Sequence, residues 1–231
     1  MKLLFVVATR KEISGILKLF PQNKTLLYDK QELFSVNSEN ININILVTGA
    51  GMMKTIYQLT KHLLKIKYDL ILNFGICGAF DRTLRIGEVI QIKSDLFSDL
   101  GAEDGEVFKT IFEIGLLNEN TLPFKNGKIH FDAEVNLPCL SNIKKVEAIT
   151  VNTVHGNDTT IKNVVEKFHA QVESMEGAAF GYVCKMENIP CLQIRSISNY
   201  MEKRNKENWN ISLAVANLEI FIKQFLKESA I

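Results

Sequence analysis

Short apolar runs alternate with amphipathic segments along almost the whole chain of 231 residues. The apolar runs are rich in β-branched residues and end at turn-forming residues, as buried strands do, and the segments between them carry apolar residues at helical spacing. Repeated strand–helix–strand units predict an α/β fold with a mainly parallel sheet and helices on both faces. We expect strands at 2–8, 43–49, 69–75, 88–94, 147–154 and 190–198, and helices at 12–20, 51–66, 160–169, 175–187 and 211–228.

The apolar content bounds the number of domains. With 46% hydrophobic residues, a chain of this length can bury a sizeable core, so we expect one domain over 1–231. The stretch 95–146 is less regular, with acidic loops and two prolines, Pro123 and Pro138. There we expect an excursion from the sheet, a flap or a subunit contact.

Charge and cysteine content exclude several classes of protein. A formal net charge of +1, with scattered basic residues, gives no reason to expect nucleic acid or an anionic membrane as partner. The apolar stretch Leu3 to Ala8 is too short for a signal peptide, and no segment approaches the roughly 18 apolar residues of a spanning helix. Four cysteines without ligand-like spacing predict free thiols in a reducing cytosol, and no metal or other cofactor is expected. The predicted location is the cytoplasm.

In an open α/β sheet, ligands bind beyond the carboxyl ends of the strands, so the residues where strands stop are the candidates for a site. The first predicted strand ends at Thr9, and Glu12 follows three residues later. This spacing matches a capping box, in which the two side chains bond the amides of the first helical turn. Alternatively, Glu12 faces a cleft and acts as a general base on water. Both interpretations stay open at this point.

Two further strand ends are rich in glycine: "TGAGMMK" at 48–54 and "NFGICGAF" at 73–80. Glycine lets the backbone turn sharply or approach a ligand closely. Neither segment matches a phosphate-binding loop or a dinucleotide fingerprint, and tight packing is the commoner explanation.

The segment "VESMEGAAF" at 172–180 predicts a helix that opens near Ser174. Glu173 is then an acid at a helix N-terminus, where the helix dipole favours it. Glu176 is followed by small apolar residues, which indicates a close approach of backbone or ligand, and we interpret it as an acceptor for ligand hydroxyls. The last predicted strand delivers Asn199 at its end.

Four of these segments together resemble the purine nucleoside phosphorylase and nucleosidase superfamily in order and spacing. They are "GAG" at 49–51, "GICGAF" at 75–80, "ESMEGAAF" at 173–180 and "IRSISN" at 194–199. The resemblance is greatest to the hydrolytic branch, which includes the methylthioadenosine/adenosylhomocysteine nucleosidases. Within that branch, "QIRSISNYMEKRN" resembles the futalosine hydrolases of menaquinone biosynthesis. The resemblance implies one domain with a mixed, partly closed sheet, a small purine nucleoside as substrate, and a homodimer or higher homo-oligomer.

The resemblance also implies roles for residues of this chain. Glu12 stands where the nucleosidases keep the carboxylate that activates water. Met175 and Glu176 stand where they pack the ribose and bind its hydroxyls, and Asn199 stands at the position that faces the purine. Gly75 is expected at the substrate as part of its glycine-rich segment.

Other residues near these segments are candidates for contacts with the purine or with the far end of the substrate. Main-chain groups from Val154 to Thr160 are expected to line the purine, with His155 as a structural histidine. Arg204 is a candidate for the anionic end of futalosine, although a solvated charge run explains it equally well. Arg195 lies within a strand and is expected to pair with an internal carboxylate.

Two departures from the superfamily pattern indicate the reaction and the base. Where hexameric phosphorylases resemble "RVGSCGA", this chain has Asn73 in place of a phosphate-binding arginine and Ile76 in place of a serine. A site without these groups holds phosphate poorly, which predicts hydrolysis. Asn199 replaces the aspartate of adenine-cleaving nucleosidases, and an amide both donates and accepts hydrogen bonds, which suits a 6-oxopurine.

The prediction is hydrolysis of the N-ribosidic bond of futalosine, releasing hypoxanthine and dehypoxanthine futalosine. The alternatives are a methylthioadenosine/adenosylhomocysteine-type nucleosidase, an inosine-type purine nucleoside phosphorylase, and a catalytically silent nucleoside sensor.

Overall fold

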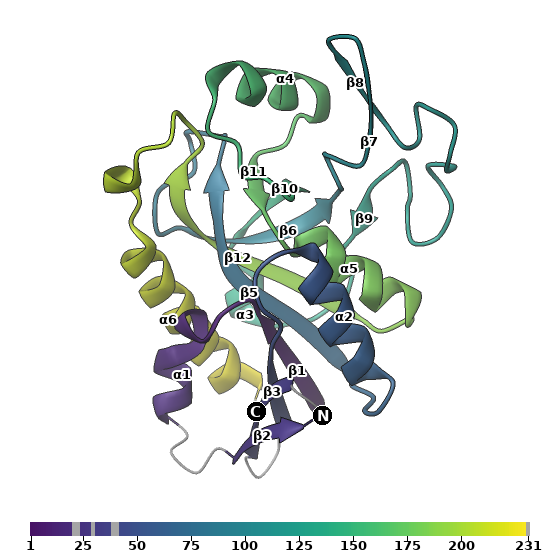
Figure 1. The fold of residues 1–231 in the computed structure, drawn as a ribbon. Coiled ribbons are helices and arrows are strands. Elements are labelled where there is room, and N and C mark those ends of the chain that lie inside the picture. The colour runs from purple at the N-terminus through teal and green to yellow at the C-terminus, as the bar shows by residue number, and fades with distance from the viewer. Residues whose placement is uncertain (20–23, 29–30, 38–41, 230–231) are drawn as a thin grey trace.

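A mixed sheet forms the centre of the structure, and helices cover both of its faces (Figure 1). The structure is a computed structural model that describes residues 1–19, 24–28, 31–37 and 42–229. Its strands are β1 (Lys2–Val7), β2 (Lys24–Tyr28), β3 (Gln31–Asn37), β4 (Asn42–Val47), β5 (Leu70–Ala79), β6 (Val89–Asp95), β7 (Gly101–Asp104), β8 (Val107–Thr110), β9 (Ile129–His130), β10 (Lys144–Thr150), β11 (Val172–Ser174) and β12 (Cys191–Tyr200). Its helices are α1 (Ser14–Leu19), α2 (Met52–Leu63), α3 (Pro138–Ser141), α4 (Asp158–Phe168), α5 (Gly177–Met186) and α6 (Ile211–Ser229), with 3₁₀ turns η1 (Arg10–Ile13) and η2 (Lys206–Asn208).

The 10-stranded sheet has the order β11-β10-β6-β12-β5-β1-β4-β3-β2, with β9 paired to β6. Neighbours at its centre are parallel, except that β12 and β6 are antiparallel, as are β2, β3 and β4. The short strand β11 pairs both with β10 and with β5, where Glu173 lies opposite Gly78. This second pairing closes β5, β12, β6, β10 and β11 into a ring. The predicted α/β fold with a mixed, partly closed sheet is confirmed.

Two apolar layers hold the helices to the sheet. Side chains alternate between the two faces of a strand. In β1, Leu3 and Phe5 pack in the layer beneath α6, where the Phe5 and Phe225 rings lie 6.2 Å apart. Leu4 and Val6 belong to the opposite layer, beneath α2 and α5. Each fully buried side chain of this kind contributes roughly 1.5–3 kcal/mol to the stability of the fold.

All six predicted strands and all five predicted helices are present, but several boundaries differ. β5 continues to Ala79, so the segment 75–79 is strand and not a turn. β10 ends at Thr150, and α5 begins only at Gly177, because the strand β11 precedes it. Glu173 therefore lies in a strand, and its predicted place at a helix N-terminus is wrong.

The remaining differences lie at the periphery. The antiparallel strands β2 and β3 were not predicted, nor was the β7–β8 ribbon within the stretch 95–146. Residue 20, at the end of the first predicted helix, and residues 230–231, at the end of the predicted domain, lie outside the described residues. The domain boundary 1–231 stays a prediction.

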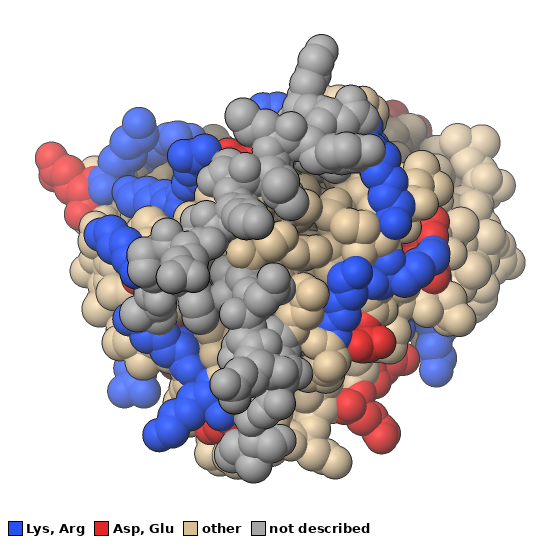
Figure 2. Space-filling view, turned by 90° about the horizontal axis from the view of Figure 1, so that it is seen from below, with Lys and Arg blue, Asp and Glu red and all other residues tan. Residues whose placement is uncertain are grey.

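Surface and cysteine chemistry agree with the composition. The four cysteines are free, as predicted, and all four are buried. On the face shown in Figure 2, basic and acidic side chains are interspersed. Within the described ranges, no helix is long and apolar enough to cross a membrane.

A buried polar cluster beneath α2 makes the stability of the fold depend on pH. The Tyr68 hydroxyl accepts from Asn44 Nδ2 at 2.6 Å and lies 2.7 Å from His62 Nε2, to which it can donate its own proton when that nitrogen is unprotonated. His62 must be neutral to accept this bond. Burial, followed by the charges of Lys2 and Lys65, lowers the pKa of His62 to about 4.

Because the folded-state pKa lies below the unfolded value of about 6.5, protonation favours the unfolded chain. The stability contributed by neutral His62 is fully present above about pH 6.5, and roughly 3 kcal/mol of it is lost as the pH falls to about 4. His62→Gln keeps an acceptor for Tyr68 but cannot titrate. In urea unfolding at pH 7, 6, 5 and 4, we expect wild type to lose more stability than His62→Gln. Parallel losses in the two proteins would contradict this assignment.

Candidate active site

A cleft of about 320 Å³ opens at the carboxyl ends of β1, β5 and β12, where the sequence placed the candidate residues. A cavity of this size suits a small molecule. Five predicted site residues line it: Glu12, Val154, Met175, Glu176 and Asn199. Its other lining residues are Ala8, Thr9, Lys11, Ala50, Ile76, Cys77, Gly78, Glu173, Ser174, Ser198, Met201, Trp209, Ile211 and Val215.

Glu12 serves as a cap and also lines the cleft. It sits in η1, directly after β1, with only 7% of its surface exposed. Its Oε2 accepts from the Thr9 amide at 2.8 Å and from the Thr9 hydroxyl at 3.2 Å. Its Oε1 makes no such bond to any described residue and lies 3.2 Å from the position that a Cβ on Gly75 would occupy. The capping box is present, and one carboxylate oxygen remains for other contacts.

The surroundings of Glu12 make it a stronger base than an exposed carboxylate. Burial raises its pKa, the nearby Glu176 carboxylate raises it further, and the Thr9 hydrogen bonds and the Arg195 charge lower it, with burial dominant. A carboxylate whose pKa is moved toward neutrality accepts a proton from water more readily.

Glu176 is the residue that precedes α5, and it lines the cleft. Its Oε1 accepts from the Gly51 amide at 2.8 Å, and its Oε2 has no protein partner within the described part of the chain. Gly51 has φ +93°, a conformation that a side chain would strain, so the glycine-rich turn brings a backbone amide to this carboxylate. The free oxygen of Glu176 can accept hydrogen bonds from ligand hydroxyls.

Asn199 lies where β12 carries a bulge, between Ile197 and Asn199. Its Oδ1 accepts from the Ser198 hydroxyl at 2.8 Å, and its Nδ2 donates to the Tyr200 carbonyl at 3.1 Å. Among the residues that the structure describes, the second amide proton has only the Met201 sulfur as an acceptor, at 3.8 Å, and sulfur accepts weakly. The neighbours thus fix the orientation of the amide and leave one N–H for a ligand in the cleft.

Three predicted site residues do not line the cleft. Gly75 lies beneath it, where a Cβ would come within 2.0 Å of Arg195 Nη1, so glycine here leaves room for the guanidinium. Thr160 is exposed at the start of α4, and its hydroxyl donates to the Asn157 carbonyl at 3.0 Å. Arg204 is exposed, with its guanidinium 5.4 Å from the ring centre of Trp209, and only the latter lines the cleft.

Two interactions differ from the sequence analysis. The expected ion pair of Arg195 is wrong: the guanidinium donates from Nε to Gln193 Oε1 at 3.1 Å and from Nη2 to Asn73 Oδ1. Glu173, which was predicted as an acid at a helix N-terminus and not as a site residue, lines the cleft. Its carboxylate accepts from the His155 amide at 2.9 Å and contacts His155 Nδ1, which holds the loop at Val154 against the cleft.

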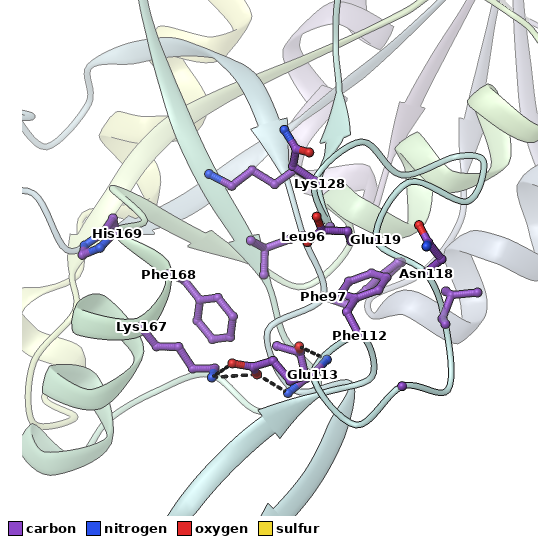
Figure 3. Close-up of a pocket in the computed structure, with 15 residues that line it drawn as sticks. Leu96, Phe97, Phe112, Glu113, Asn118, Glu119, Lys128, Lys167, Phe168 and His169 are labelled. Carbon is purple, nitrogen blue, oxygen red and sulfur yellow. Dashed lines mark hydrogen bonds and ion pairs between the residues drawn. The ribbon is translucent and has the colours of Figure 1, made fainter.

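A second cavity, of about 710 Å³, lies between the excursion that follows β6 and the C-terminal end of α4 (Figure 3). It contains none of the predicted site residues. Its floor includes Phe97, Phe112 and Phe168, and Lys167 at its edge donates to both oxygens of Glu113 at 2.8 and 2.9 Å. Because the predicted carboxylates and the Asn199 amide line the smaller cleft instead, that cleft is the better candidate for chemistry.

Comparison with known proteins identifies the family. The sequence matches the phosphorylase superfamily over residues 2–227, almost its whole length. The chain belongs to the phosphorylase superfamily. The glycine-rich strand ends and the carboxylates of the cleft lie within the matched region.

Individual relatives fall into two groups. The chain is 28% identical over 162 residues to the 5′-methylthioadenosine/S-adenosylhomocysteine nucleosidase of Shewanella halifaxensis, covering 68% of each chain. It is 24% identical over 187 residues to the futalosine hydrolase of Thermus thermophilus, covering 79% of this chain and 80% of the relative.

Solved structures in both groups share the fold. A Helicobacter pylori 5′-methylthioadenosine/S-adenosylhomocysteine nucleosidase mutant, with 5′-methylthioadenosine in its active site, superposes with a TM-score of 0.80 at 18% identity over 98% of each chain. The futalosine hydrolase of Helicobacter pylori gives a TM-score of 0.80 at 17% identity, covering 99% of this chain and 98% of that one.

Proposed function

We propose that this superfamily member hydrolyses the N-ribosidic bond of a purine nucleoside, with Glu12 as the base that activates water. The observation that carries the proposal is the convergence of Glu12, Glu176 and Asn199 on one cleft. Glu12 is buried, its pKa is raised, and one of its oxygens is free of the cap. These are the properties of a general base in a water-poor site.

The other two side chains suit the sugar and the base. The free oxygen of Glu176 can accept from the ribose hydroxyls, an interaction that stabilises the reaction when it strengthens as the sugar approaches the oxocarbenium-like transition state. The free N–H of Asn199 can donate to the purine as negative charge builds on the departing base.

Water is the nucleophile that the cleft favours over phosphate. Its lining includes the three carboxylates of Glu12, Glu173 and Glu176, with the exposed Lys11 as the lining cation. Asn73 does not reach out for a ligand, because its amide donates to the Val6 carbonyl at 2.9 Å and accepts from Arg195. A phosphate dianion would face more repulsion than attraction here.

Futalosine is the substrate we favour. Asn199 presents an amide donor, which suits the O6 and N7 acceptors of a 6-oxopurine such as hypoxanthine. Beyond the ribose, futalosine carries a benzoate, and the rim offers the Trp209 ring with Lys11 and the stacked Arg204 nearby. The match to a futalosine hydrolase over 79% of the chain supports this choice.

A second candidate is cleavage of 5′-methylthioadenosine or S-adenosylhomocysteine. The relatives with that name favour it, at 28% identity over 68% of the chain. Asn199 argues against it, since an amide cannot act as a general acid toward adenine at neutral pH. The homo-oligomer implied by the resemblance stays a prediction.

Base release decides among these substrates. Purified protein is incubated with futalosine, inosine or 5′-methylthioadenosine, each with and without phosphate, and the free base is quantified by chromatography. We expect phosphate-independent release of hypoxanthine from futalosine, with little base from the other two. Adenine as the main product would support the second candidate, phosphate-dependent turnover would identify a phosphorylase, and binding without release would identify a sensor.

A further inference from the structure

A chain of buried polar side chains runs beneath the cleft from β6 to β12. Asp95, Gln193 and Arg195 are only 0%, 0% and 2% exposed. Gln193 Nε2 donates to Asp95 Oδ2 at 3.0 Å, and Arg195 Nε donates to Gln193 Oε1 at 3.1 Å. Buried polar groups are costly unless each is satisfied, so this arrangement constrains all three side chains.

The chemistry of the three groups fixes the direction of every bond in the chain. A guanidinium only donates, so the Gln193 oxygen must face Arg195 and its NH₂ must face Asp95. Asp95 Oδ1 already accepts from the Leu96 amide at 2.8 Å and from the Thr150 hydroxyl at 3.0 Å. Asp95 therefore accepts hydrogen bonds at both of its oxygens, which favours the ionised carboxylate.

The free end of the chain lies beside Glu12. Arg195 Nη2 is held by Asn73, while Nη1 lies against the backbone of Gly75, within 2.0 Å of where a Cβ would be. Glu12 Oε1 approaches the same point at 3.2 Å. The orientation of the Arg195 guanidinium therefore determines how much positive charge the Glu12 carboxylate experiences.

We propose that Asp95 and Gln193 are positioning residues, which hold the Arg195 guanidinium beside Glu12 through a hydrogen-bond chain of fixed direction. The inference rests on the proposed function, since Glu12 is its reacting group. Neither residue lines the cleft, and each acts through Arg195.

The charges at Asp95, at one end of the hydrogen-bond chain, and around Arg195 and Glu12, at the other end, agree with this role. Burial raises the pKa of Asp95 to about 6, against the lowering effect of Gln193, Thr150, Arg195 and Leu96. Asp95 is thus ionised at neutral pH. At the other end, the Arg195 charge lowers the pKa of Glu12, whereas the Glu176 carboxylate raises it. A displaced Arg195 would let the Glu12 pKa rise.

The test is an exchange of the carboxylate and the amide between positions 95 and 193. In Asp95→Asn, the new amide must turn its oxygen to Leu96 and Thr150. Its NH₂ then faces the NH₂ of Gln193, and two donors cannot form a hydrogen bond. In Gln193→Glu, the new carboxylate faces the Asp95 carboxylate, so the hydrogen bond is replaced by repulsion between two negative charges. In the double variant the amide donates from position 95 and the carboxylate at position 193 accepts from Arg195, which restores every hydrogen bond and the net charge.

We expect each single variant to lower kcat for base release about ten- to a hundredfold, with KM little changed, because the geometry around the base is disturbed. The double variant should recover most of that loss. In Asp95→Asn, the acidic limb of the kcat–pH profile should move to higher pH, because a displaced Arg195 lets the Glu12 pKa rise, whereas the loss of the Asp95 charge alone would lower it. The matched control is Gln171→Glu: Gln171 Nε2 donates to Asp81 Oδ2 at 3.1 Å, outside the cleft, and this variant should leave kcat and the limb unchanged.

Single variants within twofold of wild type, a double variant no better than the singles, or an unmoved acidic limb would overturn the proposal. A merely structural role would lower thermal stability in the singles without moving that limb. If wild type releases no base, the proposed function fails. The unfolding temperatures of the variants still test the hydrogen-bond chain of Asp95, Gln193 and Arg195. In that case the singles must unfold earlier and the double must recover, or the fixed direction of the bonds is wrong.

Discussion

Replacing Glu12 by glutamine is expected to lower kcat for base release by about 10²–10⁴-fold, the usual contribution of a general base. Nucleoside affinity should change little, because the ribose and purine contacts that we assign to Glu176 and Asn199 remain. The measurement pairs steady-state kinetics on futalosine with calorimetric titration of a slowly cleaved analogue.

Glutamine is the informative replacement because it separates the two functions of Glu12. In wild type, the Thr9 amide and hydroxyl lie 2.8 and 3.2 Å from Glu12 Oε2. The amide oxygen of the variant can accept from the same two groups, so the cap survives. What is lost is the second carboxylate oxygen and its basicity. The matched control is Glu147→Gln, which removes the partner of Lys93 and Lys128 outside the cleft and should leave kcat unchanged.

The same assignment predicts the acidic limb of the pH profile. Because burial raises the pKa of Glu12, activity should be full above that pKa and fall as the pH drops through it, at a higher pH than for an exposed carboxylate. A Glu12→Gln variant that keeps wild-type kcat would leave Glu12 as a helix cap only. If wild type instead binds nucleosides without cleaving them, the result favours the sensor interpretation.

The strand ends were the part of the site that the sequence could predict. Glu12 lies just beyond the first strand, and Asn199 lies at the end of the last one. The carboxyl ends of parallel strands meet at one edge of the sheet, so both residues were expected at the same site. Glu173 was misplaced because β11 has only three residues and is held by pairing with β5 and β10, which no local pattern reveals.

The partners of buried polar residues were harder to predict. Gln193 and Arg195 are two positions apart on one strand, so a shared face was readable from the sequence. Asp95 is different, because it meets Gln193 only through the antiparallel pairing of β6 and β12. Thr160 shows the converse: it is close to Val154 along the chain, but it lies exposed in the first turn of α4, which Asn157 caps, and does not line the cleft.

Replacing Asn199 by aspartate is expected to change which purine is released. In the proposed wild-type complex, the amide N–H that does not donate to Tyr200 donates to the acceptors of a 6-oxopurine. In the variant, burial favours the protonated carboxyl, which has a single proton. We expect that proton to point into the cleft, which leaves an oxygen against the Tyr200 carbonyl as a cost of the substitution. A protonated carboxyl can donate to N7 of adenine while its other oxygen accepts from the 6-amino group.

The ratio of hypoxanthine to adenine release, measured as kcat/KM for futalosine or inosine against 5′-methylthioadenosine, should fall by about 10- to 100-fold, since one hydrogen bond to a charged group contributes roughly 1.5–3 kcal/mol. The matched control is Asn205→Asp on the exposed loop, where Asn205 Oδ1 accepts from the Glu207 amide at 3.1 Å and an aspartate can accept the same bond. That variant should keep the wild-type ratio. Equal losses on both classes of nucleoside in Asn199→Asp would show that Asn199 supports catalysis without selecting the base, and an unchanged ratio with unchanged rates would remove it from the site.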